Sequence, residues 1–240
     1  MVEPELDALS RYSHLAVAVD IVVFTLIEGQ LHVLLVTRGI EPFVGKLALP
    51  GGFVLAGEGL DAAAIRELQE ETGLVPGIAH VEQLRAYGAP GRDPRGHVLS
   101  VAYLALAPEL PHPTAGSDAR EARWVPVADA LGLALAFDHG QILRDGLERA
   151  RAKLEYTSLA TAFCADEFTV SDLRAVYEAV WGYPLDPRNF HRKLTGTPGL
   201  LVDTGRTRRN GQGRPASLFR AGTIAVLNPP LTRDEGFARP

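Results

Sequence analysis

The chain has 240 residues, of which 46% are hydrophobic and 22% are charged, and its net charge is −5. This length allows one large domain or two modest ones, with enough apolar material for a core. The composition is that of a globular protein and excludes disordered and fibrous classes.

Cysteine usage and hydropathy point to the cytoplasm. The single cysteine, Cys164, excludes an internal disulfide bond and lies in an apolar setting typical of a small buried side chain. The acidic N-terminus lacks the basic start of a signal peptide. The longest apolar run, residues 15–27, is too short to cross a bilayer. We therefore expect a cytoplasmic protein without membrane contact.

Two strands open the chain. Residues 17–26 are rich in Val, Ile and Phe, and residues 31–37 return after a turn at Glu28–Gln30. Arg38 ends the second strand, and Phe43 lies in the loop that follows. Such residues are usually structural, but Arg38 could contact a phosphate and Phe43 a base.

A helix follows a glycine-rich loop. Apolar residues recur with helical spacing from Leu60, and Gly73 is a stop signal. On this helix Glu67, Glu70 and Glu71 stand at i, i+3 and i+4, so all three lie on one side.

Three neighbouring carboxylates repel one another unless a cation lies between them. Mg²⁺ or Mn²⁺ accepts such oxygen ligands and bridges to substrate phosphates. Arg66 can pair with Glu58 across the junction of loop and helix. The alternative is a solvated acidic helix face.

The complete pattern resembles the Nudix box, with Gly52, Glu58, Arg66-Glu67, Glu70-Glu71 and Gly73-Leu74 at the family's spacing. The resemblance implies an α/β fold of the Nudix α/β/α sandwich type and hydrolysis of nucleoside diphosphates linked to another group. It implies a catalytic site of Glu58, Arg66, Glu67, Glu70 and Glu71. It also implies that Glu67, Glu70, Glu71 and the Gly52 carbonyl hold Mg²⁺ or Mn²⁺. The catalytic base is not assigned.

Two more strands are expected at residues 81–88 and 98–107, separated by a charged, turn-rich loop. The loop is a solvated hairpin tip on a purely structural interpretation. However, Pro90–Gly96 and Ser100–Tyr103 resemble the Nudix branch that acts on ADP-ribose. That resemblance implies that Arg92 and Arg95 face a diphosphate. The expected ligand-binding residues are therefore Arg38, Phe43, Gly52, Arg92 and Arg95.

Residues 121–127 resemble the late strand before the last Nudix helix, which we expect at residues 140–155. Asp138 is a candidate N-cap for that helix. His139 could be a base or a phosphate contact, but a capping or packing role suits it equally well.

The segment after Tyr156 has the element order of a winged helix-turn-helix: short helices near residues 160–163, 169–182 and 187–194, then strands at 200–202 and 216–220 around a loop at 205–215. Thr169 with Asp172 forms an acidic capping box, and Asp186-Pro187 starts the third helix. We expect domains at residues 1–155 and 156–225, and a flexible tail at 226–240.

Charge supports DNA binding by this segment. Residues 186–220 carry eight basic side chains and two aspartates, a net charge of +6, in a chain whose net charge is −5. A basic helix and wing on an acidic protein is typical of a DNA-binding module. The alternatives are a solvated basic surface and a dock for an acidic partner. The predicted contacts are Arg188, Asn189, Arg192, Lys193, Arg206, Arg208, Arg209 and Arg214.

The C-terminal segment resembles the Nudix-related transcriptional regulators of NAD metabolism, through Arg188–Phe190, Arg192–Leu194 and Gly213–Ala216. The resemblance implies a homodimeric repressor that binds double-stranded operator DNA and senses ADP-ribose or a related NAD metabolite. Such regulators often have a degenerate Nudix box, whereas this chain retains every carboxylate.

Three hypotheses follow. The chain is a transcription factor that senses an NAD metabolite, with or without hydrolysis. It is instead an ADP-ribose pyrophosphatase whose C-terminal domain serves assembly. Or it is a nucleotide-binding adaptor with no DNA function. The basic helix and wing favour the first.

Overall fold

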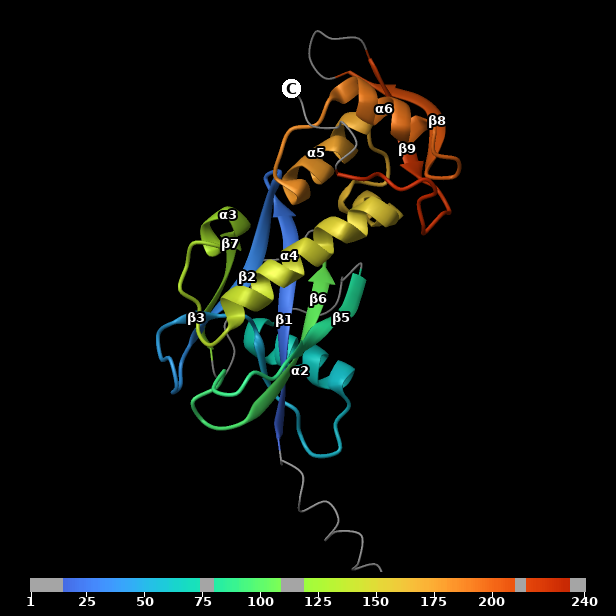
Figure 1. Cartoon of the computed structure of the whole chain (residues 1–240). Helices are drawn as coiled ribbons and strands as arrows, with labels where there is room; N and C mark the ends of the chain where they lie inside the picture. Colours follow the sequence, from blue (N-terminus) through green and yellow to red (C-terminus); the bar gives the residue numbers. More distant parts are fainter. Residues whose placement is uncertain (1–14, 74–79, 109–118, 210–214, 234–240) are drawn as a thin grey trace, which may run out of the picture.

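A central sheet covered by helices on both faces is followed by a smaller helical unit with a two-stranded wing (Figure 1). The computed structural model describes residues 15–73, 80–108, 119–209 and 215–233. Within these ranges, no helix is long and apolar enough to span a membrane.

The sheet has the order β3-β2-β1-β6-β5, with β4 also paired to β1 and β7 to β2. The parallel pairing of β1 with β6 places one long, buried strand at its centre. β1 is buried on both faces along most of its length, so its apolar run is continuous and not alternating. The strands are β1 (Ala16–Ile27), β2 (Gln30–Arg38), β3 (Leu47–Ala48), β4 (Gly51–Phe53), β5 (His80–Tyr87), β6 (Val98–Leu106) and β7 (Ala119–Pro126).

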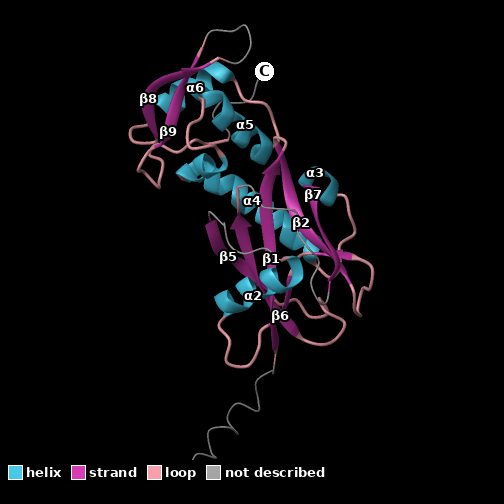
Figure 2. Ribbon diagram, turned by 180° about the vertical axis from the view of Figure 1, so that it is seen from behind, coloured by secondary structure: helices cyan, strands magenta, loops and turns pink. Residues whose placement is uncertain are grey.

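Helices α2 (Leu60–Thr72) and α4 (His139–Tyr156) lie on opposite faces of this sheet, as the two views show (Figures 1 and 2). A short helix, α3 (Val127–Ala130), follows β7. These elements form the predicted Nudix α/β/α sandwich, and the predicted strands and helices fall within a few residues of the observed ones.

Helix α2 buries Ala63, Ala64 and Leu68 against the sheet, and it ends at Gly73, which has the left-handed conformation of a helix C-cap (φ 66°). Ile65, which belongs to the same apolar run, is instead 50% exposed. Ala63, Ala64 and Leu68 define the side that faces the sheet, and Ile65 is turned about 100° beyond Ala64, away from that side.

Helix α4 packs very closely on the sheet at Gly146. A Cβ atom at this position would lie 3.0 Å from Cγ1 of Val22 on β1. Val22 is fully buried, as are Ile142 and Leu143 on the same helix. The absence of a side chain at Gly146 therefore sets the distance between helix and sheet.

The C-terminal unit contains η1 (Ser158–Phe163), α5 (Val170–Trp181), α6 (Pro187–Thr195), β8 (Leu201–Arg208) and β9 (Ala216–Ala221). The predicted caps are present: Thr169 and Asp172 form a capping box, and the Asp186 carboxylate accepts a hydrogen bond from the Asn189 N–H. The prediction that a loop begins at Gly205 was wrong. β8 continues to Arg208 because its register shifts between Asp203 and Thr207, so pairing with β9 resumes at Thr207.

Hydrogen bonds join α4 to α5 directly. The Tyr177 hydroxyl donates to the Leu154 carbonyl (3.1 Å), and Trp181 Nε1 donates to the Arg151 carbonyl (3.2 Å). Arg151 Nε in turn donates to the Val180 carbonyl (3.0 Å). The last turns of α4 therefore belong structurally to both units.

The segment after the wing is packed, which corrects the expectation of a flexible tail from residue 226. Leu227 and Leu231 are buried, and their N–H groups donate to the carbonyls of Tyr156 and Glu155 (both 2.8 Å). Arg233 forms ion pairs with Glu148 and Glu155. The two leucines, Leu227 and Leu231, are the signal in the sequence that could have predicted this packing. Residues 234–240 lie outside the described residues.

Candidate functional site

A cavity of about 320 Å³ opens between the glycine-rich loop, the second half of α2, and the loops before β6 and α4. Eight predicted site residues line it. They come from β2, β4, α2 and the loop after β5: Arg38, Gly52, Arg66, Glu67, Glu70, Glu71, Arg92 and Arg95.

Arg66 is the centre of the carboxylate cluster. Its Nε donates to Glu58 (2.7 Å), as the sequence predicted, and its Nη1 donates to both Glu67 (2.7 Å) and Glu70 (3.0 Å). The hydrogen bond from Arg66 lowers the pKa of Glu58 to about 2. Glu58 itself lies outside the cavity lining, so its role in this structure is to hold Arg66.

Glu71 has a different environment from its neighbours. Burial raises its pKa to about 8, although a hydrogen bond from the Gly51 N–H (2.8 Å) favours the charged form. Burial also raises the pKa of Glu67, against the effect of its bond to Arg66. Two carboxyl groups at the cavity floor are therefore less acidic than usual, which is typical of functional sites.

The cluster matches Mg²⁺ or Mn²⁺ in the kind of donors, but not in arrangement. Carboxylate and carbonyl oxygens are the ligands these ions prefer. Gly52 lies against Glu67, since a Cβ atom there would be 2.4 Å from Glu67 Oε1. However, no three His, Cys, Asp or Glu side chains of the described residues converge at metal-ligand distances. In the observed geometry the guanidinium of Arg66 neutralises Glu67 and Glu70.

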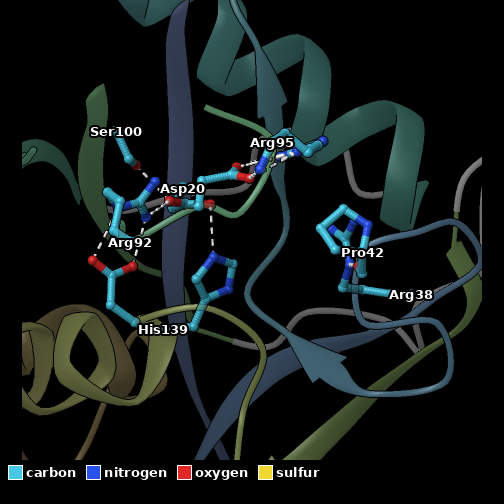
Figure 3. Close-up of polar contacts among 9 residues, drawn as sticks. Asp20, Arg38, Pro42, Arg92, Arg95, Ser100 and His139 are labelled. Carbon is cyan, nitrogen blue, oxygen red and sulfur yellow. Dashed lines mark hydrogen bonds and ion pairs between the residues drawn. The ribbon is translucent and has the colours of Figure 1, made fainter. Parts of the chain in front are cut away.

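A second network joins β1, the loop after β5 and the start of α4 (Figure 3). Asp20, which is buried on β1, accepts a hydrogen bond from the Ser100 hydroxyl and is ion-paired with Arg92 (3.5 Å). Arg92 donates through Nε (2.9 Å) and Nη2 (2.6 Å) to Asp138. Burial acts to lower the pKa of Arg92, but the hydrogen bonds to Asp138 and the charge of Asp20 outweigh it, so the pKa of Arg92 is raised.

His139 is a neutral structural residue in this network. Its Nδ1 accepts a hydrogen bond from the Leu49 N–H (2.9 Å), so the ring proton lies on Nε2, 3.3 Å from Asp20. Burial lowers the pKa of His139 despite the nearby carboxylate. Because Leu49 occupies the free lone pair, His139 cannot act as the base that the sequence left open.

Arg38 has unused hydrogen-bonding capacity. Its Nε donates to the Pro42 carbonyl (2.8 Å), but its buried Nη2 has no hydrogen-bond partner among the described residues. Its guanidinium carbon lies 4.8 Å from the centre of the Phe137 ring. The predicted ligand contact Phe43 does not line the cavity. It packs edge-on behind Phe137 (4.8 Å between ring centres), and Phe137 lines the cavity instead.

Arg95 lies over two aromatic rings. Its guanidinium carbon is 4.7 Å from the centre of the Phe53 ring and 5.5 Å from that of Phe137. It also donates to Asp93 (2.7 Å), and this bond lowers the pKa of Asp93 although burial opposes the shift. The cavity mouth thus combines flat aromatic and guanidinium groups.

Sequence reasoning missed four residues of this site: Asp20, Phe53, Asp93 and Phe137. An aspartate inside the apolar strand β1 was a usable signal, because a buried charge needs a partner. Phe137 has a positive φ (51°), which sequence does not reveal in a residue other than glycine.

The basic residues of the C-terminal unit fall into two groups. Arg188 and Arg192 are exposed on α6, while Asn189 and Lys193 are half-buried. On the wing, Arg206 pairs with Glu167, and Arg208 pairs with Asp172 (2.5 Å). Arg209 is exposed at the end of β8, and Arg214 lies outside the described residues. Among the described arginines of this unit, Arg188 and Arg192 of α6 and Arg209 of the wing form no ion pair with a carboxylate, whereas Arg206 and Arg208 do.

Comparison with known families gives two matches. Residues 14–146 match the NUDIX domain model, and residues 161–221 match the model of the NrtR DNA-binding winged helix domain. The matches cover the sandwich with the cavity and the unit with the basic helix, respectively.

Similar proteins include the ADPR responsive transcriptional repressor NtrR of Acinetobacter baylyi, 34% identical over 88% of this chain and 84% of that protein. The structure of Shewanella oneidensis NrtR with a 27mer DNA is similar at a TM-score of 0.69, with 36% identity over 85% of this chain and 93% of that one. Its NUDIX domain complexed with ADP ribose gives a TM-score of 0.56, with 36% identity over 62% of this chain and 99% of that one. The ADP-ribose pyrophosphatase of Methanocaldococcus jannaschii is 43% identical over 59% of this chain and 78% of that protein.

Proposed function

Because this chain belongs to the Nudix family and carries an NrtR-type winged-helix DNA-binding domain, we propose that it is a transcriptional repressor that responds to ADP-ribose or a related NAD metabolite. Its targets would be genes of NAD metabolism. The relatives with both domains are described as an ADPR responsive repressor and as a protein bound to DNA. A repressor acts where the DNA is, so we place the protein in the cytoplasm of a bacterium.

One observation favours ADP-ribose above other ligands of the cavity. Arg38 carries a buried guanidinium nitrogen that has no hydrogen-bond partner among the described residues. Its guanidinium lies over the Phe137 ring, and that of the neighbouring Arg95 lies over the rings of Phe53 and Phe137. A diphosphate oxygen would satisfy Arg38, because guanidinium geometry suits phosphate oxygens. The rings of Phe53 and Phe137 offer flat surfaces to a base or ribose. We infer that Arg38, Gly52, Arg92 and Arg95 contact the ligand and that Phe43 supports Phe137 from behind.

For DNA, we propose that α6 enters the major groove of a double-stranded operator, with Arg188 and Asn189 near its N-terminus closest to base edges. Arg192, Lys193 and Arg209 would contact phosphates, together with Arg206, Arg208 and Arg214 of the wing. A palindromic operator requires two winged helices, so we also propose a homodimer.

A second candidate function is Mg²⁺- or Mn²⁺-dependent hydrolysis of ADP-ribose. All the box carboxylates are present and line one cavity, and the M. jannaschii relative is described as a pyrophosphatase. We propose that Glu67, Glu70, Glu71 and the Gly52 carbonyl would hold the ion, which would supply charge neutralisation at the phosphates and a lowered pKa for water. Binding of the ion would require Arg66 to break its hydrogen bonds to Glu67 and Glu70 while it keeps its bond to Glu58. The protein would then destroy its own signal.

The test of repression uses the full-length protein and DNA from its own promoter region. Arg192→Ala should weaken DNA binding about tenfold and reduce the slope of log affinity against log salt by about one, because it removes a phosphate contact. Arg188→Ala should also weaken binding about tenfold, but it should mainly reduce the preference for the promoter sequence over unrelated DNA, because it removes a base contact. Arg85→Ala, which removes an exposed arginine of β5, is the matched control and should leave binding unchanged. Fluorescence anisotropy over a salt series measures these values.

ADP-ribose should weaken promoter binding by the wild-type protein. If no promoter fragment binds at moderate salt, repression is wrong. Release of AMP from ADP-ribose with and without Mg²⁺ tests hydrolysis separately. Glu70→Gln should abolish any release and leave DNA binding intact, whereas AMP release no faster than background would exclude the enzyme.

A further inference from the structure

Asp138 occupies the N-cap position of α4 but does not cap the helix. The N-cap residues of α5 and α6, Thr169 and Asp186, have extended backbones (ψ 161° and 119°), and their side chains accept hydrogen bonds from the first helical turn. Asp138 has ψ 18° and no side-chain cap hydrogen bond. Aspartate is among the most favourable N-cap residues, so something else engages this carboxylate.

The engaging group is Arg92, which lines the cavity. Both Asp138 oxygens accept hydrogen bonds from Arg92, whose side chain is only 4% exposed. The next residue, His139, is held by Leu49 and Asp20 at the same cavity wall. The preceding residue, Phe137, has a positive φ and lines the cavity as well. The first residues of α4 are thus fixed by groups that a ligand would touch.

The other end of α4 is fixed to the winged helix. Leu154 and Arg151 exchange hydrogen bonds with Tyr177, Val180 and Trp181 of α5. Residues 224–233, which follow the wing, add backbone bonds to Glu155, Tyr156 and Ser158. A single helix therefore runs from the cavity wall to the DNA-binding unit, as Figure 1 shows.

We propose that Asp138 is a positioning residue that couples the ligand cavity to the winged helix. Its carboxylate would either pair with Arg92 or cap the N-terminus of α4, and ligand binding would shift it from the first interaction to the second. This rests on the proposed response to ADP-ribose. A diphosphate in the cavity competes with Asp138 for Arg92, because both are anions and guanidinium pairs readily with phosphate. The released carboxylate then caps α4, which requires Asp138 to adopt an extended ψ like that of Thr169. The start of α4 shifts, and the helix carries this shift to α5.

This mechanism gives the ligand a different interaction in each state, which any shift of a conformational equilibrium requires. Without a ligand, the ion pair to Arg92 holds Asp138 away from the helix. With a ligand, the charge on Arg92 is satisfied and the cap forms.

The test is Asp138→Asn in the full-length protein. Asparagine cannot form the ion pair with Arg92, but it caps helices about as well as aspartate. The variant should therefore resemble the ligand-bound state. Its promoter affinity without ADP-ribose should fall to that of the wild type with saturating ADP-ribose. For each protein we compare the DNA dissociation constant with ADP-ribose to that without it, and this ratio should be at least fivefold smaller in the variant than in the wild type. The variant should bind ADP-ribose no more weakly than the wild type does.

Asp145→Asn is the matched control, because Asp145 lies on the same helix and bonds Tyr87 outside the network. It should keep the wild-type ratio. Asp138→Glu retains a carboxylate for Arg92 but caps less well, so it should keep the promoter affinity of the ligand-free wild type. A wild-type ratio in Asp138→Asn would overturn the proposal, as would weaker ADP-ribose binding with unchanged DNA affinity.

A second measurement does not depend on DNA. Amide hydrogen exchange at residues 139–142 should slow when ADP-ribose binds the wild type, and it should already be slow in Asp138→Asn. No change in the wild type at saturating ADP-ribose would overturn the switch. If ADP-ribose instead changes this exchange but not promoter binding, the proposed repressor function fails at the DNA step alone.

Discussion

At the scale of single residues, Glu71 is a carboxyl group whose charge opposes folding. Its pKa is raised from 4.5 to about 8 by burial, and Glu67 and Asp20 add to this shift. The folded state therefore binds a proton that the unfolded state releases between pH 4.5 and 8. The free energy of unfolding falls as pH rises through this window, by up to about 1.4 kcal/mol per unit, and the loss is complete above about pH 8.

We predict that Glu71→Gln removes this pH dependence. The glutamine keeps an acceptor for the Gly51 N–H but carries no charge. In the absence of divalent cations, the variant should be more stable than the wild type at pH 9, and the difference should shrink toward pH 5. Chemical denaturation at the two pH values measures it.

Mg²⁺ or Mn²⁺ extends this experiment to the proposed metal site. At pH 9 the ion should stabilise the wild type, where Glu71 is charged, more than Glu71→Gln. Parallel stability profiles of the two proteins across pH, with and without the ion, would contradict both the buried charge and the metal role.

The Glu58–Arg66 pair and the cavity-lining positions of Glu67, Glu70 and Glu71 could be predicted from the sequence, because helical spacing fixes which side chains share a side. The state of His139 could not, since the bond from Leu49 joins residues 90 positions apart. Asp138 was correctly placed at the start of a helix, yet its partner Arg92 is 46 positions away. Local sequence patterns predict local geometry. They do not reveal that a residue distant in the sequence binds the Asp138 carboxylate in place of the helix N-terminus.

At the scale of elements, the longer strands and helices were predictable because apolar periodicity and caps are local, whereas the short β3, β4 and α3 were not predicted. The long β8 was not, since its extension depends on pairing with β9 after a register shift. The packed segment after the wing was not either. Leu227 and Leu231 are buried in a core whose other members are distant in the sequence, and their N–H groups bond the end of α4.

The contact between α4 and the sheet gives a prediction at this scale. Gly146→Ala should destabilise the protein by about 1–3 kcal/mol, because the new methyl group would press on Val22. In an open helix position the same change would stabilise by about 1 kcal/mol. Gly140→Ala is the control in the same helix, since the nearest atom to its Cβ is the flexible end of Arg144 at 3.8 Å. Thermal and chemical unfolding give both values.

Val22→Ala in the Gly146→Ala background should recover part of the loss, because it removes the two nearest atoms, Cγ1 (3.0 Å) and Cγ2 (3.1 Å) of Val22. A double-mutant cycle isolates this term. Strict additivity of the two substitutions would contradict the close approach.

At the scale of the whole molecule, one hydrophobic core runs from the sheet through α4 into the winged helix and includes Leu227 and Leu231. Arg233 closes this junction: it pairs with Glu148 and Glu155 of α4, and its carbonyl accepts from the Tyr183 hydroxyl (3.1 Å). The two domains are therefore joined by packing on both sides of the chain connection.

We predict that Arg233→Ala weakens communication between the domains without affecting either site. ADP-ribose affinity should equal that of the wild type, while the effect of ADP-ribose on promoter binding should fall severalfold. Arg149→Ala, which removes an ion pair between α4 and Glu82 inside the first domain, is the control. Calorimetry for the ligand and anisotropy for DNA separate the two quantities. An unchanged effect of ADP-ribose would show that this junction does not transmit it.

The close contact at Gly146 also sets the mechanics of such communication. If α4 pivots at Gly146, the helix extends eight residues, about 12 Å, from the pivot toward Asp138. It extends ten residues, about 15 Å, from the pivot toward Tyr156. Because these two distances are similar, a displacement at one end of the helix would be almost equal in size at the other end. A displacement at the cavity therefore reaches the junction nearly unchanged and in the opposite direction. Any larger displacement of the DNA-binding residues must arise because the winged helix extends beyond the C-terminal end of α4.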